Sequence, residues 1–301
     1  YEICACLVGS EMCIRDSYTF IELLKATHSQ QKVCKTLGVP KSTYYVNLKK
    51  QPTKTETRRN DFLIEIKRIH AESKEIYGAP KIHALLQKKN KICSLKYIQK
   101  IMKANGIRSK TLKKYRPQSS ASKVEAIAPN LLEQDFTAEN INKKIVGDIT
   151  YIKTSDSGWC YLASFLDLHN NEICGWEFSK NMTTDIVIKA LKKTSIKRGK
   201  KLSEAIIHTD QGSQYTSKDY VAAVLELECK LSYSRKGNPY DNACIESFHS
   251  VIKKEMIYQE KTRTFEETKK VLFEYIEGWY NSRRIQKKLD YQSPYDFLKV
   301  S

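Results

Sequence analysis

Residues 145–179 read IVGDITYIKTSDSGWCYLASFLDLHNNEICGWEFS, and this stretch decides the fold. It contains three runs rich in β-branched and aromatic residues: Ile145–Lys153, Trp159–Leu168 and Glu172–Ser179. The short polar turns SDSG and HNN separate these runs. Because turns this short join antiparallel neighbours, the three runs predict an antiparallel meander.

The sequence after residue 179 alternates between helical and strand patterns. We expect helices at 185–193, 218–226, 241–258 and from a capping box at 264–267, with strands at 205–208 and 230–234. Asp241 is the expected N-cap of the third of these helices. A three-stranded meander followed by alternating helices and strands forms a mixed five-stranded sheet with flanking helices. The predicted fold class is therefore α/β, in the ribonuclease-H-like order.

The positive charge of the chain is concentrated in its first half. The 301 residues include 52 Lys and Arg against 34 Asp and Glu, a net charge of +18. Residues 41–118 alone hold 21 Lys and Arg but only 5 Asp and Glu. A solvated helix face is one interpretation of such a run, but so large a local excess favours a nucleic-acid-binding module. No run approaches ~18 apolar residues, so we expect no membrane span.

Short amphipathic patterns precede the meander. Residues 20–50 indicate two short helices around the turn Gly38–Ser42, with Ser42 as an N-cap; this favours a helix-turn-helix, although many helical hairpins have the same spacing. The stretch ACLVGSEMCIRDS has no helical period and resembles a translated sequencing adapter. The expected segments are a non-native extension (1–17), a helix-turn-helix (18–54), a second basic helical DNA-binding module (55–110), a linker (111–140) and the catalytic core with C-terminal helices (141–301).

The nine cysteines form no CxxC pair and no Cys/His cluster. This spacing argues against a disulfide scaffold and against a zinc site. Cys160 and Cys174 lie in strand-like runs, where buried, inert thiols are expected. A reducing cytoplasm fits this cysteine usage.

Three acidic residues are candidates for catalysis. Asp148 interrupts an apolar strand, Asp210 follows the strand that ends at His208, and Glu246 comes one turn into a helix. Taken singly, Asp210 fits a turn or cap and Glu246 fits a solvent-facing position. If the first two strands are neighbours, the helix can place all three carboxylates together. Such a set of oxygen ligands suits two Mg²⁺ or Mn²⁺ ions, which can drive phosphoryl transfer.

The spacing and surrounding words resemble a known family. There are 61 residues between Asp148 and Asp210 and 35 between Asp210 and Glu246, the D,D(35)E spacing of transposases and retroviral integrases. The matching words are YGAPKI (77–82), GDITYI (147–152), HTDQGSQY (208–215), GNPYDNACIESF (237–248), YNSRR (280–284) and YQSP (291–294). On these residues the chain resembles the OrfB transposase of the third insertion-sequence family, from about Tyr18 to Leu298. Ile145 departs from the Trp that the family often has there.

The resemblance implies an enzyme that cleaves a phosphodiester at the terminal inverted repeats of its element and joins the freed 3′-hydroxyl to a second strand. It implies a DDE mechanism with Asp148, Asp210 and Glu246 as catalytic residues and metal ligands, and DNA integration through a circular intermediate. It also implies a bacterial, nucleoid-associated multimer. The upstream reading frame often supplies a fusion partner by frameshifting.

Three basic residues are candidate DNA contacts. Lys253 shares one helix face with Asn242, Glu246 and His249, and it matches a family lysine, so we expect it to bind a phosphate; a surface lysine is the alternative. Arg235 and Lys236 precede that helix and are weaker candidates. His208 either orients a carboxylate or packs at the end of its strand.

Two other functions compete with transposition. A non-catalytic DNA-binding protein with this fold would be expected to lack a carboxylate, yet all three are present. A nuclease for RNA–DNA hybrids would not need two basic helical modules before its core.

Overall fold

The computed structural model describes residues 14–24, 27–48, 52–110, 128–235, 238–259 and 262–300, and the chain divides into two compact units, residues 1–63 and 64–301. The five segments expected from the sequence divide the chain more finely, and they stay a prediction. Residues 1–13 and 111–127, which belong to the expected extension and linker, lie outside the described residues.

The described residues of the first unit form three short helices, α1 (Ile14–Leu24), α2 (Gln30–Thr36) and α3 (Lys41–Leu48), and the first part of a longer helix that begins at Lys54. The three short helices enclose a small apolar cluster that includes Ile21, Val33 and Tyr44. Helix α1 starts at Ile14, earlier than the expected residue 20, so the expected absence of helix is wrong for residues 14–17.

The turn between α2 and α3 contains Gly38 in the left-handed region, at φ +66°, where glycine is favoured. The predicted N-cap at Ser42 is wrong. Helix α3 already includes that residue, and the first helical hydrogen bond runs from Tyr44 N to the carbonyl oxygen of Pro40, at 3.1 Å.

The second helical group contains α4 (Lys54–Glu72), α5 (Ala79–Lys88) and α6 (Leu95–Ala104). Ile82, Leu86, Ile98 and Ile101 are buried, which gives α5 and α6 a common apolar core. Ser94 caps α6 by accepting a hydrogen bond from Tyr97 N.

The predicted five-stranded sheet is confirmed. Its strands are β1 (Lys144–Thr154), β2 (Gly158–Asp167), β3 (Ile173–Ser179), β4 (Ile206–Thr209) and β5 (Lys230–Tyr233). Their spatial order is β3-β2-β1-β4-β5, with the β1–β2 and β2–β3 pairs antiparallel and the β1–β4 and β4–β5 pairs parallel. The meander predicted from the sequence therefore forms the antiparallel part of a mixed sheet.

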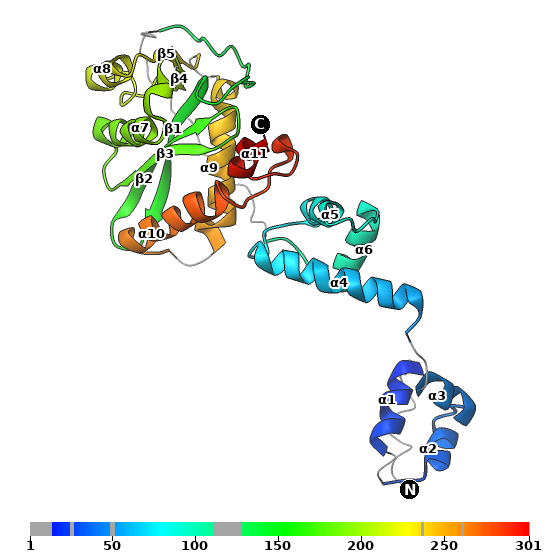
Figure 1. Ribbon diagram of the computed structural model, residues 1–301. Helices are drawn as coiled ribbons and strands as arrows, with labels where there is room; N and C mark the ends of the chain where they lie inside the picture. Colours follow the sequence, from blue (N-terminus) through cyan, green and yellow to red (C-terminus); the bar gives the residue numbers. More distant parts are fainter. Residues whose placement is uncertain are drawn as a thin grey trace. The chain divides into compact units, whose positions relative to one another are not determined.

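Helices cover both faces of this sheet (Figure 1). One face carries α7 (Thr184–Arg198) and α8 (Lys218–Glu226), and the other carries α9 (Ala243–Glu255) and α10 (Phe265–Tyr275). The main apolar core lies under α7 and α8. Gly175 allows α7 to approach closely, since a Cβ there would lie 2.4 Å from the carbonyl oxygen of Ala190. On the other face the Phe178 and Phe265 rings stack at 4.9 Å.

Short elements complete the C-terminal part: the 3₁₀ turns η1 (Gly199–Leu202), η2 (Pro239–Asn242), η3 (Ile257–Gln259) and η5 (Lys287–Leu289), the π-helical turn η4 (Ile276–Tyr280) and α11 (Pro294–Val300). The helix expected at 241–258 is thus divided into η2, α9 and η3. The predicted capping box at Thr264 and Glu267 is confirmed at the start of α10.

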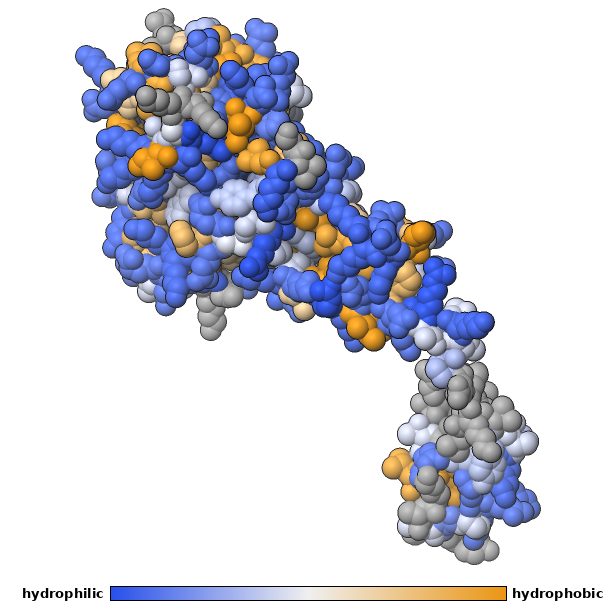
Figure 2. Space-filling model, in the orientation of Figure 1, coloured by the Kyte–Doolittle hydropathy of each residue, from blue (hydrophilic) through white to orange (hydrophobic). Residues whose placement is uncertain are grey.

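The described part of the chain offers no helix that is long and apolar enough to cross a membrane. The face of residues 64–301 seen in Figure 2 is mostly hydrophilic, with apolar residues in small groups. Cys160 and Cys174 are buried, as predicted. Burial raises the pKa of the Cys174 thiol to about 12, which keeps it protonated and unreactive.

Candidate active site

Asp148 lies in the middle of β1, on the face that α9 covers. Its carboxylate accepts a hydrogen bond from Ile149 N at 2.8 Å, and its Oδ2 lies 3.3 Å from Nδ1 of His249 on α9. The other ring nitrogen of His249 is 2.8 Å from Ser164 Oγ on β2. This imidazole therefore connects the helix to both strands at the level of the carboxylate.

Asp210 comes directly after β4, beside Asp148. In the parallel pairing of β1 and β4, Val146 is the partner of His208, so each aspartate stands two residues beyond a paired residue. Adjacent strands lie about 4.8 Å apart, which brings the two positions next to each other. Asp210 Oδ1 accepts a hydrogen bond from Gly212 N at 3.0 Å, and a Cβ at Gly212 would lie 3.0 Å from the same oxygen.

Glu246 lies in the first turn of α9, and its side chain is exposed. Asn242, one turn earlier, donates from Nδ2 to the carbonyl oxygen of Gly147 at 3.2 Å. Asn242 and His249 thus hold one face of α9 against β1 and β2. Glu246 lies on this face, three residues before His249.

The three carboxylates repel one another. Surrounding protein and the charge of Asp148 raise the pKa of Asp210 to about 6, although part of its side chain is exposed. Glu246 is exposed at the surface, but desolvation of its carboxyl group by the surrounding protein and the charges of Asp148 and Asp210 likewise raise its pKa. Carboxylates held close together are stabilised either when one of them is protonated or when a cation binds to them.

Lys253 belongs to the same electrostatic environment. It is half-buried on α9, and burial lowers the pKa of its ammonium group while the attraction of Asp148 opposes that change. The predicted orientation of this lysine toward the carboxylates fits these interactions; its contact with DNA stays a prediction.

Comparisons with known proteins identify the family. Two integrase core domain models match residues 138–239 and 246–301, and an HTH-like domain model matches residues 57–115. Transposase InsF of insertion sequence IS3A from Escherichia coli K12 is 36% identical over 270 residues, covering 89% of this chain and 93% of the relative. The transposase of insertion sequence element IS904 from Lactococcus lactis subsp. lactis IL1403 is also 36% identical, over 84% of this chain and 99% of the relative.

This chain belongs to the IS3 family of transposases. It is accordingly a DDE-type transposase with an integrase core. The HTLV-2 integrase catalytic core domain in complex with magnesium aligns with a TM-score of 0.40 and 16% identity, over 52% of this chain and 95% of that chain, a similarity too low to add to the assignment.

The HTH-like model of the transposase matches the second helical group. That segment contains α5 and α6 and most of α4. The expected helix-turn-helix at 18–54 therefore stays a prediction, supported by the short helices α2 and α3 around Gly38.

The chemistry of the donor set suits a hard divalent cation, because the three coupled carboxylates offer only oxygen ligands. Within the described residues, no group of three or more His, Cys, Asp and Glu side chains stands close enough together to form a closed metal site. The carboxylates of the transposase thus fit a divalent ion in the type and charge of their ligand atoms. In the described residues they do not form a closed set of ligands around one point.

Arg235 and Lys236 are the other two candidate DNA contacts, and Arg235 is paired with a carboxylate of the protein itself. Arg235 donates from its backbone N and from Nε to Asp241 Oδ2, at 2.8 and 3.0 Å, and from Nη2 to Oδ1 at 2.9 Å. Asp241 thus compensates the charge of Arg235 in the transposase; its DNA contact stays a prediction. Lys236 lies outside the described residues.

The predicted N-cap role of Asp241 is wrong. Asp241 is fully buried inside η2, and Asn242 occupies the N-cap position of α9. Besides Arg235, Asn130 and Gln134 donate to the Asp241 carboxylate, at 3.1 and 2.9 Å. A buried carboxylate needs several donors, and only the fold brings them from positions more than 100 residues away.

His208 packs inside the protein. It is fully buried, and its two ring nitrogens lie 2.8 and 3.1 Å from Ser232 Oγ and Ser234 Oγ. Burial lowers its pKa to about 4, an effect that nearby Asp241 partly opposes. Of the two interpretations of this histidine, the structural one is therefore confirmed.

The sequence did not assign a role to His249. The helical spacing places this histidine on the same helix face as Glu246. Its contacts to Asp148 and Ser164 depend on strands that are about 85 to 101 positions earlier in the sequence. A histidine three residues after Glu246, the glutamate expected to be catalytic, was the available signal.

Proposed function

We propose that Asp148, Asp210 and Glu246 are the catalytic carboxylates of this IS3-family transposase and that they hold two Mg²⁺ or Mn²⁺ ions. The observation that supports this most directly is the position of both aspartates two residues beyond the paired Val146 and His208. The docking of α9 by Asn242 and His249 adds the glutamate to the same side of the sheet.

The reaction consists of two phosphoryl transfers. In the first, a water oxygen bonds to the phosphorus at the element end, and the bond from that phosphorus to the 3′ oxygen breaks. In the second, the freed 3′ oxygen bonds to another phosphorus, whose own 3′ oxygen leaves, so the number of phosphodiester bonds is conserved. Divalent ions at the carboxylates would activate the attacking oxygen and stabilise the leaving one.

The residues of this chain have separate tasks in that reaction. His249 holds the Asp148 carboxylate at a set distance from β2, and Asn242 keeps α9 in register. Lys253, whose ammonium group interacts with the charge of Asp148, would bind the phosphate that is cleaved.

The proposed partners follow from the family. They are the terminal inverted repeats and target DNA, further copies of this chain in a multimer, and the product of the upstream frame as a fusion partner. The expected place of action is the bacterial nucleoid in the cytoplasm.

The test incubates the full chain with Mg²⁺ and labelled DNA ends of its own element. Asp148→Asn and Glu246→Gln are each expected to lower cleavage and strand transfer by at least ~100-fold. Glu226→Gln, at an exposed site on α8, is the matched control and is expected to keep full activity. Equal activity of all three variants would reject the site. Binding without cleavage by the unaltered chain, with the upstream frame supplied, would favour a DNA-binding protein.

A further inference from the structure

The ends of β1 and β2 that meet at the turn 155–157 carry an exposed group of aromatic side chains. Along β2, burial decreases from Ala163, which belongs to the core under α7 and α8, through half-buried Tyr161 to Trp159, which is 59% exposed. On β1, Tyr151 is 49% exposed, and Lys153 is exposed as well. The apolar core therefore ends before these side chains, and they are available at the surface.

Tyr151, Lys153, Trp159 and Tyr161 form one surface, the β1–β2 patch. In the antiparallel register Tyr151 is the partner of Tyr161. Lys153 is the partner of Trp159. Because side chains alternate along a strand, all four lie on one face of the sheet, opposite to the face of Asp148. The two tyrosine rings make a T-shaped contact at 5.4 Å, which restricts their motion, so a ligand that stacks on them loses little further conformational freedom.

The patch borders the carboxylates of the proposed active site. The paired residues of β1 and β4 end at Val146 and His208, so the rest of β1 extends past the end of β4. Tyr151 follows Asp148 by three residues, which is about 10 Å along the strand. Desolvation raises the pKa of the Tyr151 hydroxyl, and the charges of Asp148 and Asp210 raise it further. About three stacked nucleotides span the distance from the carboxylates to this ring.

The chemistry of the patch fits unpaired nucleotides. Lys153 makes no ion pair or hydrogen bond with any residue that the structure describes. The nearby Asp156 accepts a hydrogen bond from Phe265 N, at the start of α10, at 2.9 Å. Aromatic rings beside a free ammonium group bind bases by stacking and a phosphate by charge. In a duplex the faces of the bases are covered by their neighbours, so an unpaired strand uses these rings better.

A second copy of this chain would also bury the aromatic rings of the patch. The chain carries a net charge of +18, so two copies repel each other, whereas the same charge attracts DNA. The charge of the chain thus favours DNA over a second copy.

We propose that the β1–β2 patch binds unpaired nucleotides of the DNA end, with bases stacked on Tyr151 and Trp159 and a phosphate bound by Lys153. The patch holds the reacting strand apart from its complement while the phosphodiester lies at the carboxylates. The inference rests on the proposed function in taking DNA as the partner.

Tryptophan fluorescence can report on this patch. The chain has three tryptophans, of which Trp176 and Trp279 are each 8% exposed, while Trp159 is 59% exposed. The test titrates the full chain with oligothymidylate of about 12 nucleotides, without divalent ions, so that no DNA is cleaved. The oligonucleotide is expected to quench the emission of the unaltered chain and to leave that of Trp159→Phe nearly unchanged. No quenching, or equal quenching in Trp159→Phe, would overturn the proposal.

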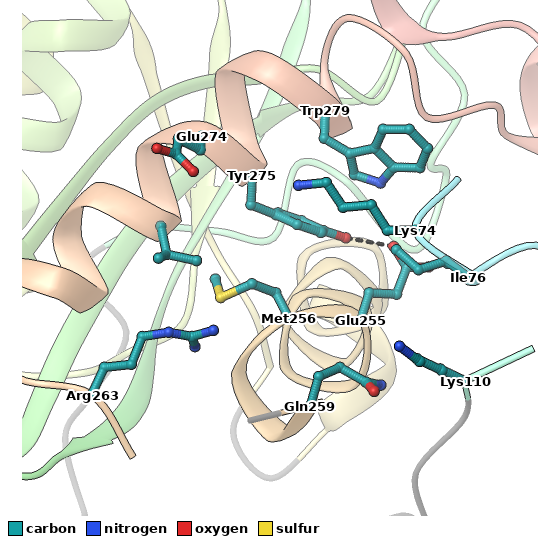
Figure 3. A pocket seen from close by; sticks show the side chains of 11 residues that line it. Lys74, Ile76, Lys110, Glu255, Met256, Gln259, Arg263, Glu274, Tyr275 and Trp279 are labelled. Carbon is teal, nitrogen blue, oxygen red and sulfur yellow. Dashed lines mark hydrogen bonds between the residues drawn. The ribbon is translucent and has the colours of Figure 1, made fainter. Parts of the chain in front are cut away.

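Variants of Tyr151 measure the stacking. Tyr151→Ala is expected to raise the oligonucleotide concentration for half-maximal quenching by at least ~5-fold, whereas Tyr151→Phe keeps the ring and is expected to leave it unchanged. Phe273→Ala is the matched control, because Phe273 is 59% exposed on α10, at the other face of the sheet. It directly precedes Glu274 and Tyr275, which line the cavity in Figure 3. Equal concentrations for Tyr151→Ala and Phe273→Ala would overturn the proposal.

Two further measurements separate the other occupants. A duplex at the same nucleotide concentration is expected to quench the emission less than the single strand, and equal quenching would overturn the preference for unpaired nucleotides. In sedimentation velocity without DNA, Tyr151→Ala is expected to keep the oligomeric state of the unaltered chain; loss of a multimer would assign the patch to an interface between copies and overturn the proposal. Failure to cleave DNA would reject the proposed function without changing these readings, so the two can fail separately.

Discussion

Helix α9 carries two glutamates in opposite surroundings. Glu246, near its start, is exposed at the surface, and desolvation of its carboxyl group together with the charges of Asp148 and Asp210 raises its pKa. Glu255, at its end, is bound by Arg284 through Nε and Nη2 at 2.8 and 2.7 Å and by the Tyr275 hydroxyl at 2.6 Å, and these donors hold its pKa below the ordinary value. The difference separates a carboxylate that stabilises the fold from one that the proposed function assigns to the metal site.

The largest expected effect distinguishes the two glutamates by stability. Glu255→Gln leaves Arg284 buried without its partner and is expected to lower the free energy of unfolding by about 3–5 kcal/mol. Glu246→Gln removes a repelled charge and is expected to change it by less than about 0.5 kcal/mol. Urea denaturation of both variants measures this difference, and equal losses would contradict the comparison.

His249 tests whether the carboxylates proposed to be catalytic depend on the position of α9. His249→Ala is expected to lower cleavage by about 10- to 100-fold and to raise the Mg²⁺ concentration needed for half-maximal rate, because Asp148 loses its support. His83→Gln, which alters a histidine bonded to the Cys93 carbonyl oxygen on the helical group, is the control. Full activity of His249→Ala at all Mg²⁺ concentrations would remove this role.

At low pH the difference in unfolding free energy between the unaltered chain and Glu255→Gln should decrease. The folded protein lowers the pKa of Glu255, so its stabilising effect is complete above the unfolded value of about 4.3 and is lost as the pH falls toward the folded value. The difference in unfolding free energy between the unaltered chain and Glu255→Gln is therefore expected to be constant from pH 7 to 5 and to shrink below about pH 4.3. A constant difference down to pH 3 would show that the ion pair is not its source.

The smallest expected effect concerns Lys253. Lys253→Gln is expected to weaken binding of element ends a few-fold and to reduce the salt slope by about 1, with unchanged thermal stability. Lys254→Gln, its neighbour, is the matched control. If both variants behave alike, Lys253 is a surface lysine.

The sequence by itself determined the local elements and the family. Period-2 and period-3.6 patterns predicted the strands and most helices, because side-chain periodicity reports which face of an element is buried. The words around Asp148, Asp210 and Glu246 predicted the catalytic residues, which only an experiment on the enzyme can test. The capping box at Thr264 was also predictable, since it needs residues only three positions apart.

The tertiary structure alone decided which distant groups meet. Asp241 looked like an N-cap because its sequence neighbours fit one, but Asn130, Gln134 and Arg235 bind it in the interior. His249 and the pair of Glu255 and Arg284 depend in the same way on contacts between separate elements. The free energy of a buried polar group is set by the partners that surround it, and linear spacing does not record those partners.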